Sequence, residues 1–262
     1  MKYFINLNAV EQTLIATFFT WGVTSLGAAS VFLFKKLNYK ILNLLLGFAG
    51  GVMIAASFWS LLMPAIDLTI SMNQISWLIP SIGFLCGGFF VICSDILLDK
   101  VLSKHTISQN TKRSALLVGA ITIHNIPEGM AVGVAFGSAA LGLYGATTIS
   151  ACLLALGIGL QNFPEGAGVA LPLRREGYSQ RKSFLYGQAS GMVEPIFGVL
   201  GAILVCFVRS ILPFLLSFSA GCMICVVGRE LLPEASKEHK NFSSLGLILG
   251  FIIMMILDVS LG

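Results

Sequence analysis

Two stretches of the chain carry the same pattern of polar residues inside long apolar runs. Residues 124–129 read His-Asn-Ile-Pro-Glu-Gly, and residues 161–166 read Gln-Asn-Phe-Pro-Glu-Gly. Imidazole, carboxylate and amide groups cost free energy in hydrocarbon, and proline interrupts a helix. Because the pattern occurs twice with the same internal spacing, it indicates a function, and these donor groups together are typical ligands of a metal ion.

Helical spacing brings the donor groups of each stretch together. The first residue and the glutamate lie four apart, which places them on one face of a helix, and the asparagine flanks that face. The proline before each glutamate removes a backbone donor and frees the carbonyl four residues earlier. The candidate ligands are His124, Asn125 and Glu128 in the first stretch, and Gln161, Asn162 and Glu165 in the second.

A third glutamate, Glu194, is followed by Pro195 in the next apolar run. With Glu128 and Glu165 it would place three carboxylates in a medium where even one isolated charge is expensive. No Lys or Arg lies at that depth to neutralise them, so protons or cations must occupy the site. One imidazole with carboxylate and amide oxygens, and no thiolate, favours Zn(II), Mn(II), Fe(II) or Cd(II) over Cu(I), Mg or Ca.

The composition predicts the elements that hold these residues. The 262 residues are 56% hydrophobic and 11% charged, with a mean hydropathy of +0.89, whereas soluble domains are about a quarter charged. A helix crosses the hydrocarbon in about 20 residues. Runs of that size predict an all-α polytopic membrane protein with eight spans in a single domain, residues 1–262. The predicted spans are 11–33, 41–63, 77–97, 114–136, 146–169, 183–208, 211–233 and 243–261.

The first run has an alternative interpretation as a signal peptide, because small residues follow it. Its length, with Lys2 as the only basic residue before it and Glu11 at its start, favours a span. The basic residues then predict orientation. With both termini outside, 13 of the 16 Lys and Arg fall in cytosolic connections, which satisfies the positive-inside rule. The formal charge of +4 therefore reflects topology, and no nucleic-acid partner is expected.

Other polar and sulfur-containing residues have simpler interpretations. All six cysteines lie within predicted spans and indicate no disulfide framework. Cys222 and Cys225 have the spacing of a metal or redox pair, but a helix rich in small residues favours a packing role. Asp95 and Asp99 are expected to pair with nearby loop lysines, namely Lys100 and Lys104. His105, a single loop histidine, indicates nothing further.

With these residues in place, the chain resembles the ZIP (Zrt/Irt-like) divalent metal transporters. The paired motifs carry the resemblance. Gln161 in the second motif, residues 193–195 (Val-Glu-Pro) and residues 230–234 (Glu-Leu-Leu-Pro-Glu) resemble the GufA-type bacterial branch. The resemblance extends over essentially all eight spans. It implies a 3+2+3 arrangement in which the first three and last three spans form an inverted repeat, usually as a homodimer.

The resemblance also implies roles for particular residues. It places a transport site at His124, Glu128, Gln161, Glu165 and Glu194, with Asn125 and Asn162 completing a second, bridged metal position. Met53 and Asp67 match positions on an outer pathway, and Glu230 matches one on the inner exit. Many family members have His where this chain has Gln161, which implies broader use of Mn, Fe or Cd. Arg229 beside Glu230 is a further departure and is expected to form a salt bridge there.

These features predict a carrier in the plasma membrane, here the bacterial inner membrane, and not an enzyme. It would import divalent transition metals, with Zn²⁺ first, into the cytosol by alternating access, and the metal would be substrate rather than catalytic cofactor. A passive divalent cation channel is the alternative. A membrane di-iron enzyme would need several His-rich boxes, and this chain has three histidines. A scaffold held by small-residue contacts would leave the three buried carboxylates unexplained.

Overall fold

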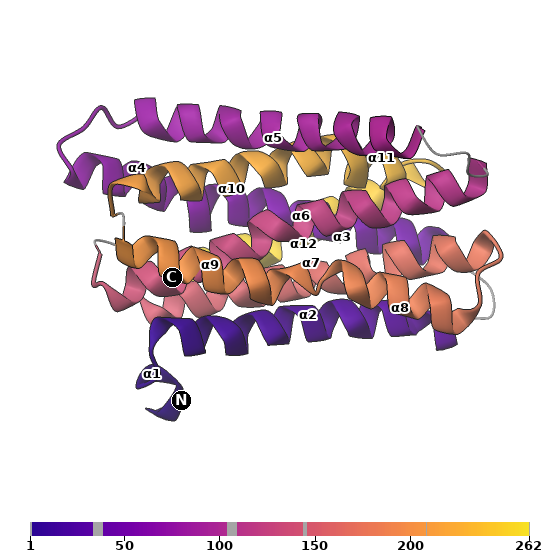
Figure 1. The fold of residues 1–262 in the computed structure, drawn as a ribbon, viewed down its shortest axis with the longest axis horizontal. Coiled ribbons are helices and arrows are strands. Elements are labelled where there is room, and N and C mark those ends of the chain that lie inside the picture. The colour runs from indigo at the N-terminus through magenta and orange to yellow at the C-terminus, as the bar shows by residue number, and fades with distance from the viewer. Residues whose placement is uncertain (1, 34–38, 104–108, 144–145, 208, 262) are drawn as a thin grey trace.

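The computed structural model describes residues 2–33, 39–103, 109–143, 146–207 and 209–261, and this part of the chain forms helices without a strand (Figure 1). The prediction of an all-α protein is confirmed. The elements are α1 Lys2–Ile5, α2 Ala9–Leu33, α3 Tyr39–Ala56, η1 Ser57–Leu62, α4 Met63–Ser71, α5 Leu78–Ser103, α6 Gln109–Ala140, α7 Thr148–Arg175, α8 Gln180–Ser190, α9 Val193–Phe207, η2 Arg209–Ile211, α10 Leu212–Val226, η3 Val227–Leu231, α11 Leu232–Ala235 and α12 Lys240–Leu261.

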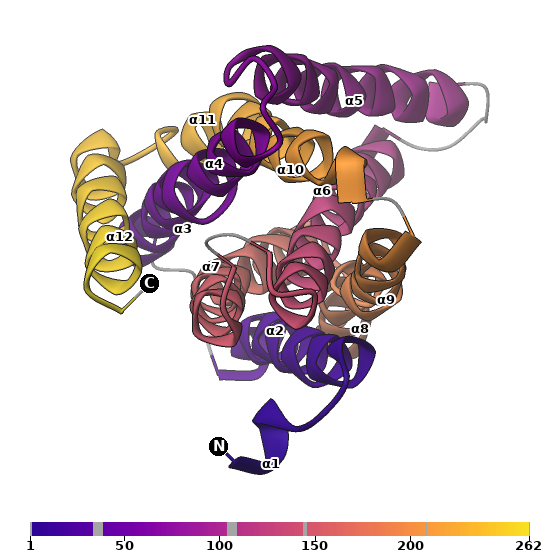
Figure 2. The ribbon, with the colours of Figure 1, turned by 90° about the vertical axis from the view of Figure 1, so that its left-hand side faces the viewer.

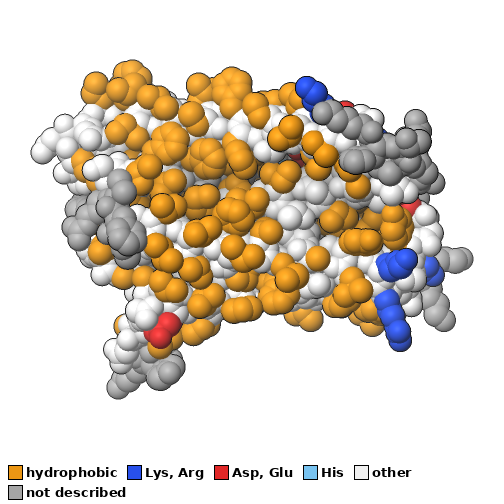
Figure 3. All heavy atoms as spheres, in the orientation of Figure 1, with side chains coloured by type: hydrophobic (Ala, Val, Ile, Leu, Met, Phe, Trp, Pro, Cys, Tyr) orange, Lys and Arg blue, Asp and Glu red, His pale blue; other side chains and the backbone are white. Residues whose placement is uncertain are grey.

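Seven described helices or helical runs are long and apolar enough to cross a membrane, and apolar side chains cover the face drawn in Figure 3. They are Ala9–Leu33, Tyr39–Ser71, Leu78–Ser103, Ser114–Ala140, Gln180–Val205, Leu212–Ala235 and Lys240–Ser260. The chain is therefore a multi-pass membrane protein, as predicted. Helix α7 is long enough, at 28 residues, but the amides, carboxylate and prolines of its motif lower its hydropathy. The count of eight spans stays a prediction.

The long helices pack in two groups, which Figure 2 shows end-on. One group contains α2, α6, α7, α8 and α9, and the other contains α3 with α4, α5, α10 with α11, and α12. The most extensive contacts pair α2 with α7 and α6 with α9 in the first group, and α3 with α12 and α5 with α10 in the second. Both sequence motifs lie in the first group, and contacts of α3 with α7 and α10 with α6 join the groups.

Glycines allow the motif helices to approach their neighbours closely. A Cβ atom at Gly129 would meet the backbone of Glu194 at the start of α9, and one at Gly166 would meet the backbone of Thr24 in α2. Each of these glycines follows the motif glutamate directly. The last residue of each motif therefore brings a third helix against the polar residues, as small residues do at membrane helix interfaces.

Two long helices contain a widened, π-helical turn. Helix α3 continues through η1 into α4, and α10 continues through η3 into α11. Pro64 and Pro233 each occupy one of the first positions after the widened turn. A single π turn inside an α-helix re-aims the side chains that it carries and is frequent at functional sites. In this protein the turns carry Ser60 and Arg229, and both contact an aspartate on another helix.

Basic side chains mark one end of the bundle. In Figure 3 the visible Lys and Arg side chains gather at the end opposite the two termini labelled in Figure 1. Lys35, Lys36, Lys104 and His105 lie outside the described residues. Among the described residues, the α5 aspartates form ion pairs with cations other than Lys100, and the expected pairing with Lys104 lies outside the described residues. Asp99 Oδ1 lies 2.8 Å from Nζ of Lys112 on α6, and Asp95 contacts Arg229, because neighbouring helices bring these cations within reach.

Candidate metal centre

The predicted ligands are all buried in the interior of the helix bundle. Pro127 lies inside α6 and Pro164 lies inside α7, and both helices continue through the proline. The α8–α9 run breaks just before Glu194, which lies in the first turn of α9, where the positive end of the helix dipole favours a carboxylate. No predicted ligand is more than 5% exposed. They are His124, Asn125, Glu128, Gln161, Asn162, Glu165 and Glu194.

Hydrogen bonds join the two motifs and the third glutamate. The Gln161 Nε2 group donates to Glu128 Oε1 at 2.5 Å, which links α7 to α6. The Asn162 Nδ2 group donates to Glu194 Oε1 at 2.9 Å and to the carbonyl of Thr20 at 3.2 Å. The Thr20 hydroxyl donates to the other Glu194 oxygen. Protein donors therefore satisfy both oxygens of Glu194.

Several buried oxygens at the centre have no hydrogen-bond partner among the described residues. Both oxygens of Glu165 and Oε2 of Glu128 are unpartnered, as are the amide oxygens of Asn125, Gln161 and Asn162. Each of the three amide nitrogens faces an acceptor oxygen, which fixes which atom of each amide is the oxygen. A buried acceptor without a partner costs about 1–3 kcal/mol, and more if it is charged. A hard or borderline cation bound to these oxygens would relieve that cost, so the donor set fits a divalent metal.

The charges at the centre reinforce this fit. The Glu128 carboxylate interacts electrostatically with those of Glu165 and Glu194. Among the described residues, no Lys or Arg forms an ion pair with any of the three. Three carboxylates without a basic partner can be neutralised only by protons or by added cations.

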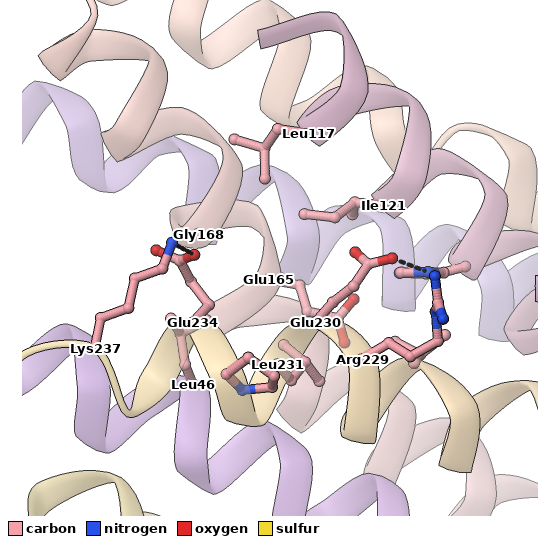
Figure 4. Close-up of a pocket in the computed structure, with 13 residues that line it drawn as sticks. Leu46, Leu117, Ile121, Glu165, Gly168, Arg229, Glu230, Leu231, Glu234 and Lys237 are labelled. Carbon is pink, nitrogen blue, oxygen red and sulfur yellow. Dashed lines mark hydrogen bonds and ion pairs between the residues drawn. The ribbon is translucent and has the colours of Figure 1, made fainter. Parts of the chain in front are cut away.

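A cavity of about 290 Å³ is lined by Glu165 together with Arg229 and Lys237, two of the basic residues (Figure 4). His124 and Glu230 also line it. The His124 Nε2 atom lies 3.1 Å from Glu230 Oε1. The imidazole thus faces Glu230 of η3 as well as lying on the helix face of Glu128.

A second set of candidate ligands surrounds this histidine. One ligand atom from each of Asp95, His124 and Glu230 lies within 4.8 Å of the other two, and we call these three residues the inner cluster. Arg229 Nε lies 3.3 Å from Asp95 Oδ2. The expected salt bridge of Arg229 is therefore formed with Asp95 of α5, while Glu230 contacts His124.

A smaller cavity lies on the side of the centre away from the basic end. It measures about 170 Å³, and Ser60, Leu154 and Asp258 are among its lining residues. Leu154 and Glu165 are eleven residues apart on α7, about 16 Å along a helix, and Ile158 between them is fully buried. The predicted pathway residues are placed differently, because Met53 is buried in α3 whereas Asp67 is partly exposed in α4. Their role stays a prediction.

The sequence analysis did not predict that Asp95 and Thr20 belong to the site. The sequence analysis expected Asp95 to pair with loop lysines, although an ionisable residue inside an apolar run itself indicates a functional site. Thr20 belongs to a set of threonines at helical spacing on α2, all at most 1% exposed, which indicates a polar, buried stripe. The stripe consists of Thr13, Thr17, Thr20 and Thr24.

Replacing Thr20 tests the contribution of this stripe. Thr20→Val removes the hydroxyl that donates to Glu194, and a hydrogen bond to a charged group contributes about 1.5–3 kcal/mol. We expect metal uptake to fall by roughly tenfold or more. The matched control is Thr17→Val, because the Thr17 hydroxyl donates to the carbonyl of Thr13 in its own helix. Equal uptake by the two variants would show that Thr20 does not position Glu194.

The chain is similar to known proteins over nearly its whole length. The family model described as ZIP Zinc transporter matches residues 103–258. The zinc transporter ZIP11 of Bos taurus is 39% identical, covering 97% of this chain and 98% of the relative. The zinc transporter GufA of Myxococcus xanthus is 34% identical over 95% of this chain and 98% of its own length. The zinc transporter ZIPB of Bordetella bronchiseptica is 31% identical over 92% of this chain and 79% of its own length.

Proposed function

This chain belongs to the ZIP zinc transporter family, and we propose that it imports divalent transition metal ions into the cytosol by alternating access. Zn²⁺ is the first substrate, because relatives in animals and bacteria are named zinc transporters. Mn²⁺, Fe²⁺ and Cd²⁺ suit the same oxygen-rich donor set. The observation that carries the proposal is the group of buried, unpartnered carboxylate and amide oxygens between α6 and α7.

We propose two adjoining metal positions within this group. Glu128 and Glu165 would bridge them, because each glutamate has at least one buried oxygen without a partner. His124, Gln161 and Glu194 would contribute to the first position, and the second would be completed by Asn125 and Asn162. Asn162 donates to Glu194 through its Nδ2, which leaves its unpartnered Oδ1 available to a metal at the second position.

The two cavities support alternating access over a passive channel. The larger cavity reaches Glu165 from the basic end, which we assign to the cytosol by the positive-inside rule. The smaller cavity ends at Leu154, and buried side chains such as Ile158 separate it from the metal centre. This arrangement supports the proposal of a carrier whose site is accessible from the inside and closed from the outside.

Uptake into proteoliposomes tests the function directly. Purified protein reconstituted without other carriers should take up radioactive zinc with saturable kinetics, and excess Mn²⁺, Fe²⁺ or Cd²⁺ should compete. A rate that rises linearly with zinc concentration would favour a channel. No uptake above that of empty liposomes, from protein shown to be folded, would contradict the proposal.

The helix contacts support the proposed 3+2+3 arrangement of eight spans in a single transmembrane unit. In the proposed repeat, α2 corresponds to α9, α3 to α10, α5 to α12 and α6 to α7. The contact between α2 and α7 then corresponds to the contact between α9 and α6. Likewise, the contact between α5 and α10 corresponds to the contact between α12 and α3. All four of these pairs make extensive contacts. The widened turns η1 and η3 also fall in spans that the exchange relates. We propose a homodimer in the bacterial inner membrane with both termini outside.

The residue at the start of the second motif should tune metal choice. Gln161→His replaces a neutral amide oxygen with an imidazole nitrogen, a stronger ligand for zinc. We expect the zinc concentration at half-maximal uptake to fall several-fold and competition by Mn²⁺ to weaken. The control Gln180→His changes a glutamine at the start of α8 whose side chain donates to the carbonyl of Val31. Unchanged competition in the Gln161 variant would remove this residue from the selectivity site.

A further inference from the structure

Arg229 is a cation built into the edge of the inner cluster. It lies in the widened turn η3, with its Nε 3.3 Å from Asp95 Oδ2 on α5. The next residue, Glu230, contacts His124 at 3.1 Å. Asp95, His124 and Glu230 could hold a divalent ion, so the guanidinium occupies one side of a candidate cation site. The other Asp95 oxygen, Oδ1, is buried and has no hydrogen-bond partner among the described residues.

The position of Arg229 places it on the route that an imported ion would take. Arg229, Glu230 and His124 line the cavity that reaches Glu165 (Figure 4). Lys237 also lines this cavity, but it lies just after α11 and is paired with Glu234 of that helix. The Arg229 side chain is 45% exposed, so the guanidinium has room to leave Asp95 without entering a more buried place.

The corresponding position at the smaller cavity, residue 60, carries no charge. Ser60 in η1 lies four residues before Pro64, as Arg229 in η3 lies four before Pro233. The Ser60 hydroxyl donates to Asp258 Oδ1 at 2.7 Å. Each widened turn therefore contacts an aspartate on another helix. In η1 the contact is made by a neutral serine, whereas in η3, toward the basic end, it is made by an arginine. Helix geometry alone does not require an arginine there.

We propose that Arg229 competes with the transported metal for Asp95 and so prevents its retention on the inner cluster. This inference rests on the proposed function. A divalent ion that reaches His124 and Glu230 must share Asp95 with the guanidinium or displace it, and the two cations repel each other. Metal binding at the inner cluster is consequently weak. The ion leaves for the cytosol, and Arg229 returns to Asp95.

Zinc binding to the inner cluster can be measured with the central site disabled. In the Glu165→Ala background, we expect the additional change Arg229→Gln to tighten binding of zinc by roughly tenfold, because it removes a nearby, partly screened positive charge. Arg229→Lys in the same background keeps the charge and should leave binding weak. Adding Asp95→Asn to the Arg229→Gln protein should abolish the gain. Binding is followed by competition with a chromophoric chelator in detergent.

Zinc affinity that stays within twofold when Arg229→Gln is added to the Glu165→Ala protein would overturn the inference, provided that both proteins elute as folded, monodisperse particles. If Arg229→Gln does not fold, Arg229→Ser decides in the same assay, because serine occupies the corresponding position at residue 60. In proteoliposomes, Arg229→Gln alone should lower the saturated uptake rate several-fold. Absence of uptake by the unsubstituted protein would instead refute the proposed function and leave the binding result intact.

Discussion

Glu165→Ala is expected to reduce zinc uptake to about 1% of the unsubstituted rate or less, since losing a charged ligand costs about 3 kcal/mol. Both oxygens of Glu165 are buried and unpartnered, and its side chain lines the cavity toward the basic end. We therefore place it at the point where the ion leaves the centre. Uptake into proteoliposomes, normalised to the amount of inserted protein, measures the effect.

The same geometry predicts that Glu165→Ala folds normally. The glutamate makes no hydrogen bond to the described residues that the substitution would break, and its removal reduces the repulsion among three buried carboxylates. Glu194→Ala differs, because it strips Thr20 and Asn162 of their acceptor. The matched control is Glu176→Ala at the end of α7, where the carboxylate accepts a hydrogen bond from Ser114. Uptake by Glu165→Ala comparable to that of this control would refute the assignment of Glu165.

Gly133→Ala is expected to destabilise the protein by about 3 kcal/mol or more, because overpacking against rigid neighbours is costly. A Cβ at Gly133 would collide with the carbonyl oxygen of Gly198 and lie 2.8 Å from the backbone nitrogen of Ala202. These atoms belong to the backbone of α9, so no side chain can rotate away. Helices α6 and α9 would have to separate, and Glu194 would move with α9.

A second glycine provides the control for this prediction. A Cβ at Gly22 in α2 would meet nothing within 4 Å, and alanine in a helix is favoured over glycine by about 1 kcal/mol. Gly22→Ala should therefore be neutral or slightly stabilising, whereas Gly133→Ala should lower the midpoint of thermal unfolding in detergent by several degrees. Similar midpoints for the two variants would show that α6 and α9 are less tightly packed than the structure indicates.

The all-helical, membrane-spanning architecture could be predicted because hydrophobic runs of sufficient length are a local property of the chain. The apolar run at 146–169 likewise coincides with α7, a 28-residue helix, although the polar groups of residues 161–165 lower its hydropathy. The motif spacing also predicted which polar residues share a face. It could not predict that Gln161 would donate to Glu128 and Asn162 to Glu194, since these bonds depend on how α6, α7 and α9 pack.

The contacts of the inner cluster also could not be predicted from the sequence, because they join residues that are far apart in the chain. Asp95 and Arg229 are 134 positions apart, and the prediction for Asp95 considered only nearby lysines. Their contact requires that α5 packs on α10 and that the widened turn η3 directs Arg229 toward it. Thr20 and Glu194, 174 positions apart, meet because Gly129 and Gly166 let α9 and α2 approach the motifs. Helical periodicity contains no information about such distant partners.

We propose that the buried oxygens between α6 and α7 bind the transported metal. Anomalous X-ray scattering at the zinc absorption edge, from crystals grown with zinc, tests it most directly. We predict a peak about 2.0–2.2 Å from carboxylate oxygens of Glu128 and Glu165, with the Gln161 amide oxygen also in contact. Zinc found at the inner cluster alone, with the oxygens of Glu128 and Glu165 free of metal, would contradict the account.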